Sequence, residues 1–97
     1  MSWSDWKAFL ESQITLVPEE SGVYRLENVN DTLYIGRTDN LRRRLLEHLN
    51  SNDSCIKQAT VFKYLVTTSP EMTEDALLKD YMRTHVGELP RCNAKRD

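Results

Sequence analysis

Four side chains that could act together on a phosphodiester lie between positions 24 and 48. Tyr24 and Tyr34 stand ten positions apart, and His48 follows Arg44 by four. Attack of water on a phosphodiester needs a base, neutralisation of the phosphoryl charge and help for the leaving group. Tyrosine and histidine can transfer protons, and arginine presents a fork of N–H donors that fits phosphoryl oxygens. These residue types therefore indicate phosphodiester chemistry.

Two short strands must position the tyrosines. The runs Gly22–Leu26 and Thr32–Gly36 each contain β-branched and aromatic residues, which are typical of strands. The segment 28–31 between them is rich in Asn and Asp, so we expect an antiparallel hairpin. Gly36, at the end of the second run, is typical of a bulge or a close backbone approach.

A helix must carry the arginine and the histidine. Asp39 can cap its N-terminus, and the helix is predicted to run to Asn50. Helical spacing predicts a buried face formed by Leu41, Leu45 and Leu49. Arg44 and His48 then fall on the edge of that face and point back towards the sheet, whereas Arg43 points to solvent.

The remaining segments predict a small α+β fold. We expect an N-terminal helix over Ser2–Ile14, whose Trp3 and Trp6 close one side of the core. The β-rich run Ala59–Thr67 predicts a third strand, and Pro70 begins a third helix that Gly87 ends.

Length and composition limit the classes of protein. Ninety-seven residues suffice for one domain, predicted as 1–97, with the helix in 1–15 and the core in 16–93. The net charge of −2 restricts any contact with nucleic acid to a local basic patch. No apolar run reaches the length of a membrane span, so we expect a cytoplasmic protein. Cys55 and Cys92 lack CxxC spacing, and we expect free thiols there, with a bridge as the alternative.

The motifs Gly22-Val23-Tyr24 and Tyr34-Ile35-Gly36, followed by Arg44 and His48, resemble the GIY-YIG nuclease family, in particular its UvrC-type nuclease domain. The similarity covers nearly all of the chain from Leu16 to Asn93. It includes the basic stretch 39–44 and the later stretches 73–78 and 90–93.

The resemblance implies a fold and an activity. It implies a three-stranded antiparallel sheet flanked by helices, and hydrolysis of DNA phosphodiesters with one divalent metal ion, Mg²⁺ or Mn²⁺. Its catalytic residues match Tyr24, Tyr34, Arg44 and His48. The carboxylate that holds the metal lies four residues after the alanine of the third helix, which gives Asp80. The family usually has glutamate there, and Asp is one carbon shorter.

The resemblance also implies contacts with DNA. The basic residue after the second motif matches Arg37, and a late family asparagine matches Asn93. Arg42 and Arg43 are expected to form a solvated face that can touch backbone phosphates. A nuclease of repair or recombination, aided by a targeting protein, is the first hypothesis. The alternative, favoured by Asp80 and the acidic net charge, is a non-catalytic module that binds nucleic acid on the same scaffold.

Overall fold

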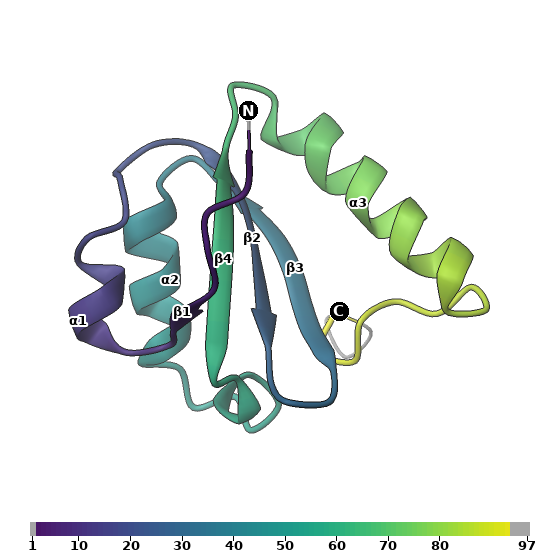
Figure 1. Cartoon of the computed structure of the whole chain (residues 1–97), viewed down its shortest axis with the longest axis horizontal. Coiled ribbons are helices and arrows are strands. Elements are labelled where there is room, and N and C mark those ends of the chain that lie inside the picture. The colour runs from purple at the N-terminus through teal and green to yellow at the C-terminus, as the bar shows by residue number, and fades with distance from the viewer. Residues whose placement is uncertain (1, 94–97) are drawn as a thin grey trace.

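The computed structural model describes residues 2–93 and has an α+β fold (Figure 1). Its sheet is antiparallel and has four strands in the order β1-β4-β2-β3, not the expected three. The elements in chain order are β1 (Lys7–Ala8), α1 (Glu11–Ile14), β2 (Gly22–Glu27), β3 (Thr32–Thr38), α2 (Leu41–Leu49), the 3₁₀ turn η1 (Ile56–Gln58), β4 (Val61–Val66) and α3 (Pro70–Thr84).

The expected hairpin is confirmed. β2 pairs with β3 along its whole length, and Tyr24 stands opposite Gly36 in the register. The Asn28 side chain accepts hydrogen bonds from the backbone N–H groups of Asn30 and Asp31, which closes the turn. β2 also pairs with β4, so β2 is a central strand and β3 an edge strand.

The helices lie on different sides of the sheet (Figure 1). Because side chains alternate along a strand, Tyr24 and Leu26 share one face, and α2 covers it with Leu41 and Leu45. Val23 and Arg37 belong to the opposite face, which α3 covers. β3 is the last strand of the sheet. Side chains from the α2 layer and from the α3 layer can therefore meet around its free edge.

The N-terminal helix predicted over residues 2–14 is wrong for most of that range. Only α1 is helical, and the segment before it runs extended along the edge of β4. Ser4 and Phe9 donate backbone hydrogen bonds to β4-side carbonyl oxygens, those of Tyr64 and Thr60, at 2.8 and 2.9 Å. Satisfying this otherwise open strand edge outweighs the helical spacing of the sequence.

The two tryptophans do not close the core. The ammonium group of Lys63 instead lies over both indole rings. Its nitrogen is 5.0 Å from the ring centroid of Trp3 and 4.5 Å from that of Trp6. Trp6 remains 45% exposed. The residue that this segment contributes to the core is Phe9, which packs edge-on against Phe62.

The ends of the helices differ in detail from the prediction. Asn40, not Asp39, caps α2, with its side chain accepting a hydrogen bond from the backbone of Arg43. The buried side of α2 is formed by Leu41, Leu45 and His48, while Leu49 is only partly buried. After α3 the chain turns at Gly87, where φ is +79°, a conformation that suits a residue without Cβ.

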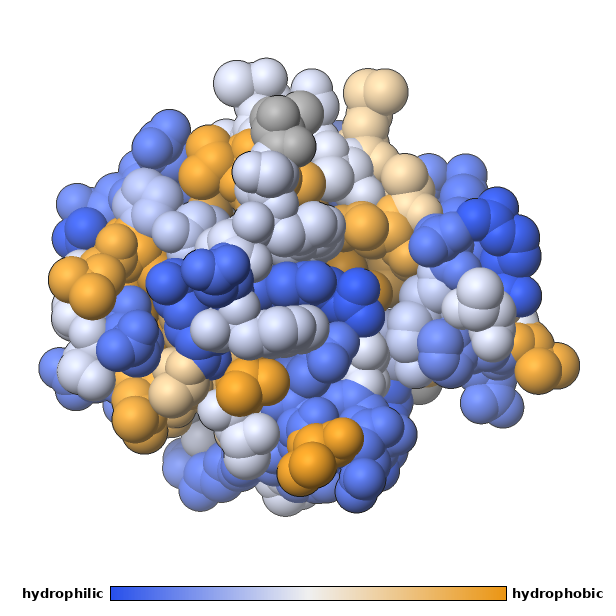
Figure 2. All heavy atoms as spheres, viewed as in Figure 1, coloured by the Kyte–Doolittle hydropathy of each residue, from blue (hydrophilic) through white to orange (hydrophobic). Residues whose placement is uncertain are grey.

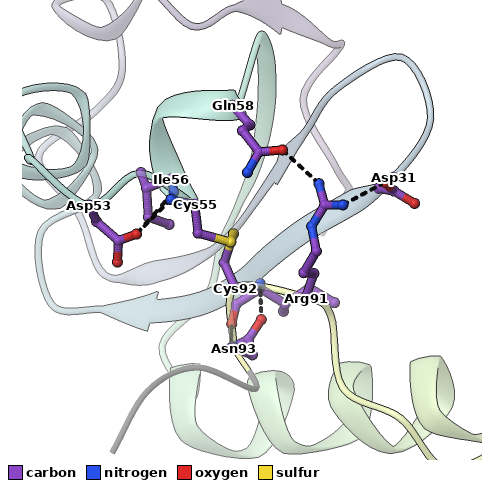
Figure 3. Close-up of a disulfide and its surroundings, with 9 residues drawn as sticks. Asp31, Asp53, Cys55, Ile56, Gln58, Arg91, Cys92 and Asn93 are labelled. Atoms are coloured by element: carbon purple, nitrogen blue, oxygen red, sulfur yellow. Dashed lines mark hydrogen bonds and ion pairs between the residues drawn. A yellow bond between two sulfur atoms is a disulfide. The ribbon is translucent and has the colours of Figure 1, made fainter.

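The expectation of two free thiols is wrong. Cys55 and Cys92 form a disulfide, with their Cα atoms 5.7 Å apart (Figure 3). The bridge ties the turn η1 to the C-terminal segment, which Arg91 also fastens through Gln58 and Asp31. Because 37 positions separate the cysteines, only the folded topology brings them together.

The surface carries no extended apolar area on the face in view. Figure 2 shows hydrophobic residues there as separate small patches among hydrophilic ones. Within residues 2–93, no helix has the length and apolar character needed to cross a membrane.

Candidate active site

Tyr24 is the buried centre of the site. Its side chain has no exposed surface, and its hydroxyl lies 2.7 Å from Nε2 of His48. The ring passes over Gly36, where a Cβ would stand 2.5 Å from the Tyr24 hydroxyl oxygen and 2.6 Å from the Tyr34 ring. Any other residue at position 36 would displace a tyrosine. The close approach expected at this glycine is confirmed.

His48 is neutral at neutral pH. Burial, followed by the nearby charge of Arg44, lowers the pKa of His48 to about 4. A neutral imidazole has one nitrogen free to accept a hydrogen bond, so Nε2 can accept from the Tyr24 hydroxyl. The ring also packs edge-on against Tyr34, with centroids 5.2 Å apart.

Arg44 points back towards the sheet, as its place on the helix predicts. Burial acts to lower the pKa of its guanidinium, but the hydrogen bond to Glu47 and the Tyr24 hydroxyl together raise it. The bond to Glu47 measures 2.9 Å. Because arginine can only donate, the Tyr24 oxygen accepts from Arg44 and can pass its own proton towards His48. The three side chains therefore form one chain of donors and acceptors.

Two cavities open beside Tyr34 and Arg44, which line both of them. The first, the histidine cavity, has a volume of about 190 Å³ and is lined also by Glu47, His48, Ser51, Asp53, Ile56 and Cys92. The second, the arginine cavity, has a volume of about 270 Å³, and its other lining residues are Arg37 and Glu74. Tyr34 and Arg44 thus lie at the boundary of the two cavities, where a ligand in either cavity could contact them.

The arginine cavity gathers charges from both sides of β3. Arg37 leaves the face of the sheet opposite to Tyr24, and its guanidinium lies 3.6 Å from a carboxylate oxygen of Glu74. Burial raises the pKa of Glu74, and the charge and backbone N–H of Arg37 offset part of that rise. Sequence reasoning missed Glu74, although its spacing from Leu77, Leu78 and Tyr81 places it on the packed face of α3.

Asp80 does not join these residues. It lines neither cavity, its side chain is 64% exposed, and its carboxylate pairs with Arg83 of the next helical turn. The reason is the rotation of α3 about its axis. When its apolar side chains pack against the sheet, Asp80 lies on the side of the helix that faces solvent. The carboxylate to which the resemblance assigns the metal therefore stands apart from both cavities.

Arg42 and Arg43 also stand outside both cavities. Arg42 donates a hydrogen bond of 2.8 Å to the carbonyl oxygen of Val17 and pairs with Glu19. Arg43 is exposed, as predicted, and pairs with Asp39. Both guanidinium groups lie on the surface of α2. A phosphate of the DNA backbone could reach them there by replacing their carboxylate partners.

Asn93 is engaged with the edge of β3. Its side-chain oxygen accepts from the backbone N–H of Ile35, and its amide nitrogen donates to the Ile35 carbonyl oxygen, both at 2.9 Å. Cys92 adds a backbone bond to Leu33. The C-terminal segment therefore covers the free edge of β3 beside Tyr34.

The donor set limits the kind of metal ion that the site could hold. Among residues 2–93, no three His, Cys, Asp or Glu side chains are grouped so that they could hold a metal ion. Mg²⁺ is often bound through one or two carboxylates, with water and phosphate oxygens as its other ligands. The arginine cavity, with the carboxylate of Glu74 in its wall, fits that kind of site.

Comparison with known proteins places this arrangement in a family. The model of the GIY-YIG catalytic domain matches residues 20–81. The chain belongs to the GIY-YIG family. Tyr24, Tyr34, Arg44 and Glu74 all lie within the matched region, whereas Cys92 and Asn93 lie beyond it.

The similar proteins include UvrC sequences. UvrABC system protein C of Hydrogenobaculum sp. is 35% identical over 77 residues, covering 74% of this chain and 14% of that protein. The same component from Aquifex aeolicus is 36% identical over 52 residues, covering 54% of this chain and 9% of that protein. The chain therefore spans only about a seventh or less of these relatives.

A solved structure has the same fold. The GIY-YIG N-terminal endonuclease domain of UvrC from Thermotoga maritima, bound to its catalytic divalent cation, magnesium, gives a TM-score of 0.61 at 26% identity. The match covers 84% of this chain and 91% of that one. A likeness over this share of both chains supports the family assignment.

Proposed function

We propose that this GIY-YIG domain is a divalent-metal-dependent endonuclease that hydrolyses DNA phosphodiester bonds, in repair or recombination. The observation that carries the proposal is the arginine cavity, where Tyr34 meets two guanidinium groups and one carboxylate. A phosphate in this cavity would find donors for its oxygens in Arg37 and Arg44. The UvrC relatives support DNA as the substrate.

The reaction assigns a separate task to each side chain. Tyr34 takes the proton of the attacking water as the water oxygen bonds to phosphorus and the P–O bond to the leaving sugar oxygen breaks. That oxygen takes up a proton from solvent. Arg44 and Arg37 stabilise the charge on the phosphoryl oxygens, and their positive charge favours the phenolate of Tyr34 that a base requires. A bound Mg²⁺ or Mn²⁺ would supply further charge stabilisation.

Tyr24 and His48 act through Arg44. Tyr24 has no exposed surface, so it cannot touch a phosphate in the described conformation. Its hydroxyl lies between the guanidinium of Arg44 and Nε2 of His48. We therefore assign Tyr24 and His48 as positioning residues, which hold Arg44 at the boundary of the two cavities.

DNA selection would come from a partner. The net charge of −2 provides little general attraction to DNA, and the basic residues of α2 are paired with carboxylates. We infer that a targeting protein brings the domain to its substrate. The name of the relatives, a component of the UvrABC system, is consistent with such a partner.

The test is a cleavage assay with purified protein on supercoiled plasmid, branched DNA and single-stranded DNA, with Mg²⁺, Mn²⁺ or a chelator. We expect metal-dependent nicking of at least one substrate and its loss in Tyr34→Phe. A chain that binds DNA but cuts none of the three with either metal would favour the non-catalytic module. The pairing of Arg44 with Glu47 is the observation that favours that second function.

A further inference from the structure

Both tryptophans of the chain lie together on the surface and line neither cavity of the active site. Trp3 is partly buried and Trp6 is 45% exposed. Their extended segment runs along β4, on the opposite side of the sheet from the edge strand β3 (Figure 1). Both precede residue 20, where the match to the family model begins. Neighbouring indole rings at a surface are typical of a binding site, because each presents a large apolar ring with one polar group.

Lys63 supplies a positive charge beside both rings. Its ammonium nitrogen lies within 5.0 Å of the two ring centroids. Among residues 2–93, no carboxylate forms an ion pair with this lysine. The ammonium group is therefore stabilised by aromatic faces instead of a counter-ion, and it stays available to an anion.

A second cation stands directly beside Lys63. Lys63 on β4 and Arg25 on β2 are cross-strand partners, so their side chains leave the same face of the sheet. Like charges directly opposite each other on neighbouring strands destabilise a sheet. Burial, followed by the charge of Arg25, lowers the pKa of Lys63, as this repulsion requires. An anion bound between the two side chains would remove the repulsion.

Arg25 also has a donor without an acceptor. Its Nη2 donates to Glu27 at 2.9 Å and to Thr32 at 2.8 Å. Its Nε is buried and has no hydrogen-bond partner among residues 2–93. Because a buried donor without an acceptor is destabilising, the pair of cations lowers the stability of the sheet. Binding of an anion at this pair would offset that cost.

We propose that Trp3, Trp6, Lys63 and Arg25, which we call the indole site, bind single-stranded nucleic acid. Indole rings stack on nucleobases of any sequence, and cations beside them pair with the backbone phosphates. The N-terminal segment, β4 and β2 are successive neighbours, so the row from Trp6 to Arg25 spans two strand spacings, about 10 Å. A duplex hides the faces of its bases, so the indole rings select unpaired strands. The indole site goes beyond the endonuclease proposed above, because it shares no residue with either cavity.

The tryptophans report on the indole site directly, because the chain contains no others. Their fluorescence is titrated with a short oligothymidylate in the presence of a chelator, so that binding is read without cleavage. We expect saturable quenching by the single strand and much weaker quenching by a DNA hairpin of the same length. Two phosphate contacts predict a slope of log affinity against log salt of about −1.4, at about −0.7 per contact.

Substitutions separate stacking from charge, with binding measured by fluorescence anisotropy of a labelled oligothymidylate. Trp6→Ala removes one ring and should weaken binding about 5–150-fold, the range for loss of one base stack. Lys63→Gln removes the charge, so the salt slope should become shallower by about 0.7. Lys57→Gln, a change at an exposed lysine of η1, is the matched control and should bind like wild type. Melting curves verify that each variant is folded.

Three results with wild type would overturn the proposal. Binding of oligothymidylate that leaves the tryptophan fluorescence unchanged would place the strand elsewhere on the protein. Equal quenching by the hairpin would remove the selection of unpaired strands. Quenching by a proline-rich peptide but not by oligothymidylate would assign the rings to a protein ligand.

Plasmid cleavage with Mg²⁺ or Mn²⁺ separates this proposal from the endonuclease function. Saturable quenching by oligothymidylate without any cleavage would leave the indole site in place and remove the endonuclease. Cleavage by a protein whose tryptophans do not respond to oligothymidylate would do the reverse.

Discussion

Gly36 makes the site possible because it has no side chain. The Tyr24 ring crosses β3 at this glycine and brings its hydroxyl to His48 and Arg44. A methyl group there would collide with both tyrosines, whose rings are held by the core. The glycine of the second motif is thus explained by packing. Both tyrosines are buried, at 0% and 2% exposed, but Tyr34 lines both cavities and Tyr24 lines neither.

Arg44 and its neighbour Leu45 should separate chemistry from stability. Arg44→Ala removes a donor aimed at the cavities and little of the core, so cleavage should fall about 10²–10³-fold. Its unfolding free energy should change by about 1 kcal/mol or less. Leu45→Ala should lose about 2–5 kcal/mol of stability, because Leu45 is fully buried. Thermal melts and cleavage rates of both variants test this pair. A stable Leu45→Ala beside an unfolded Arg44→Ala would contradict the assigned phase of α2.

His48 should make stability depend on pH in acid. Its pKa is lowered to about 4 in the folded state, from an ordinary 6.5 in the unfolded chain. Between these values the unfolded state binds more protons, so stability rises with pH there and its full contribution is present above 6.5. As the pH falls from 6.5 through about 4, protonation of His48 in the unfolded chain lowers the free energy of unfolding by about 3 kcal/mol.

Unfolding measured from pH 3.5 to 7.5 tests the histidine. His48→Gln should show a flatter dependence than wild type, while His85→Gln, a change at an exposed histidine, should keep the wild-type slope. Equal slopes in wild type and His48→Gln would mean that His48 is not held in its neutral form.

At the scale of elements, the site is assembled at the free edge of β3. α2 supplies Arg44 from one face of the sheet, α3 supplies Glu74 from the other, and the segment 90–93 covers the edge between them. The disulfide fixes this last segment, which otherwise touches the sheet through few backbone bonds. Cys92 itself lines the histidine cavity, so the bridge forms part of the site wall.

Reduction of the disulfide should therefore destabilise the protein. In the chain-entropy account, a disulfide between cysteines 37 positions apart lowers the entropy of the unfolded chain. Its reduction should lower the free energy of unfolding by about 4 kcal/mol. For a domain of this size that corresponds to a fall in melting temperature of roughly 15 °C or more. Melting with and without a dithiol reductant measures it, with the double variant Cys55→Ser, Cys92→Ser as the control. A melting temperature unchanged by the reductant in wild type would contradict the contribution of the bridge.

At the scale of the molecule, the charge distribution predicts weak and salt-sensitive DNA binding. The arginine cavity offers two cations, and Arg42 and Arg43 can add two more at the surface of α2. At about −0.9 per phosphate contact, the slope of log affinity against log salt should lie between about −2 and −4. Fluorescence anisotropy of a labelled duplex over a salt series gives the slope. A value near −8 would require a basic surface other than this one.

The sequence alone determined the parts that depend on local spacing. Alternation along two short runs and a polar turn predicted the hairpin, and helical spacing predicted that Arg44 and His48 face the sheet while Arg43 does not. The motifs also indicated the family. These inferences succeed because the direction of a side chain within one strand or helix follows from its position in that element.

Tertiary structure decided what depends on contacts between distant segments. The strand at Lys7–Ala8 exists because β4 has an open edge, and the bridge from Cys55 to Cys92 exists because the fold brings distant residues together. The carboxylate of α3 that lines a cavity with Tyr34 is Glu74 and not Asp80, since packing on the sheet sets the rotation of α3. A count along the helix gives the spacing of its residues, but only the surface that it covers decides which face is turned to the site.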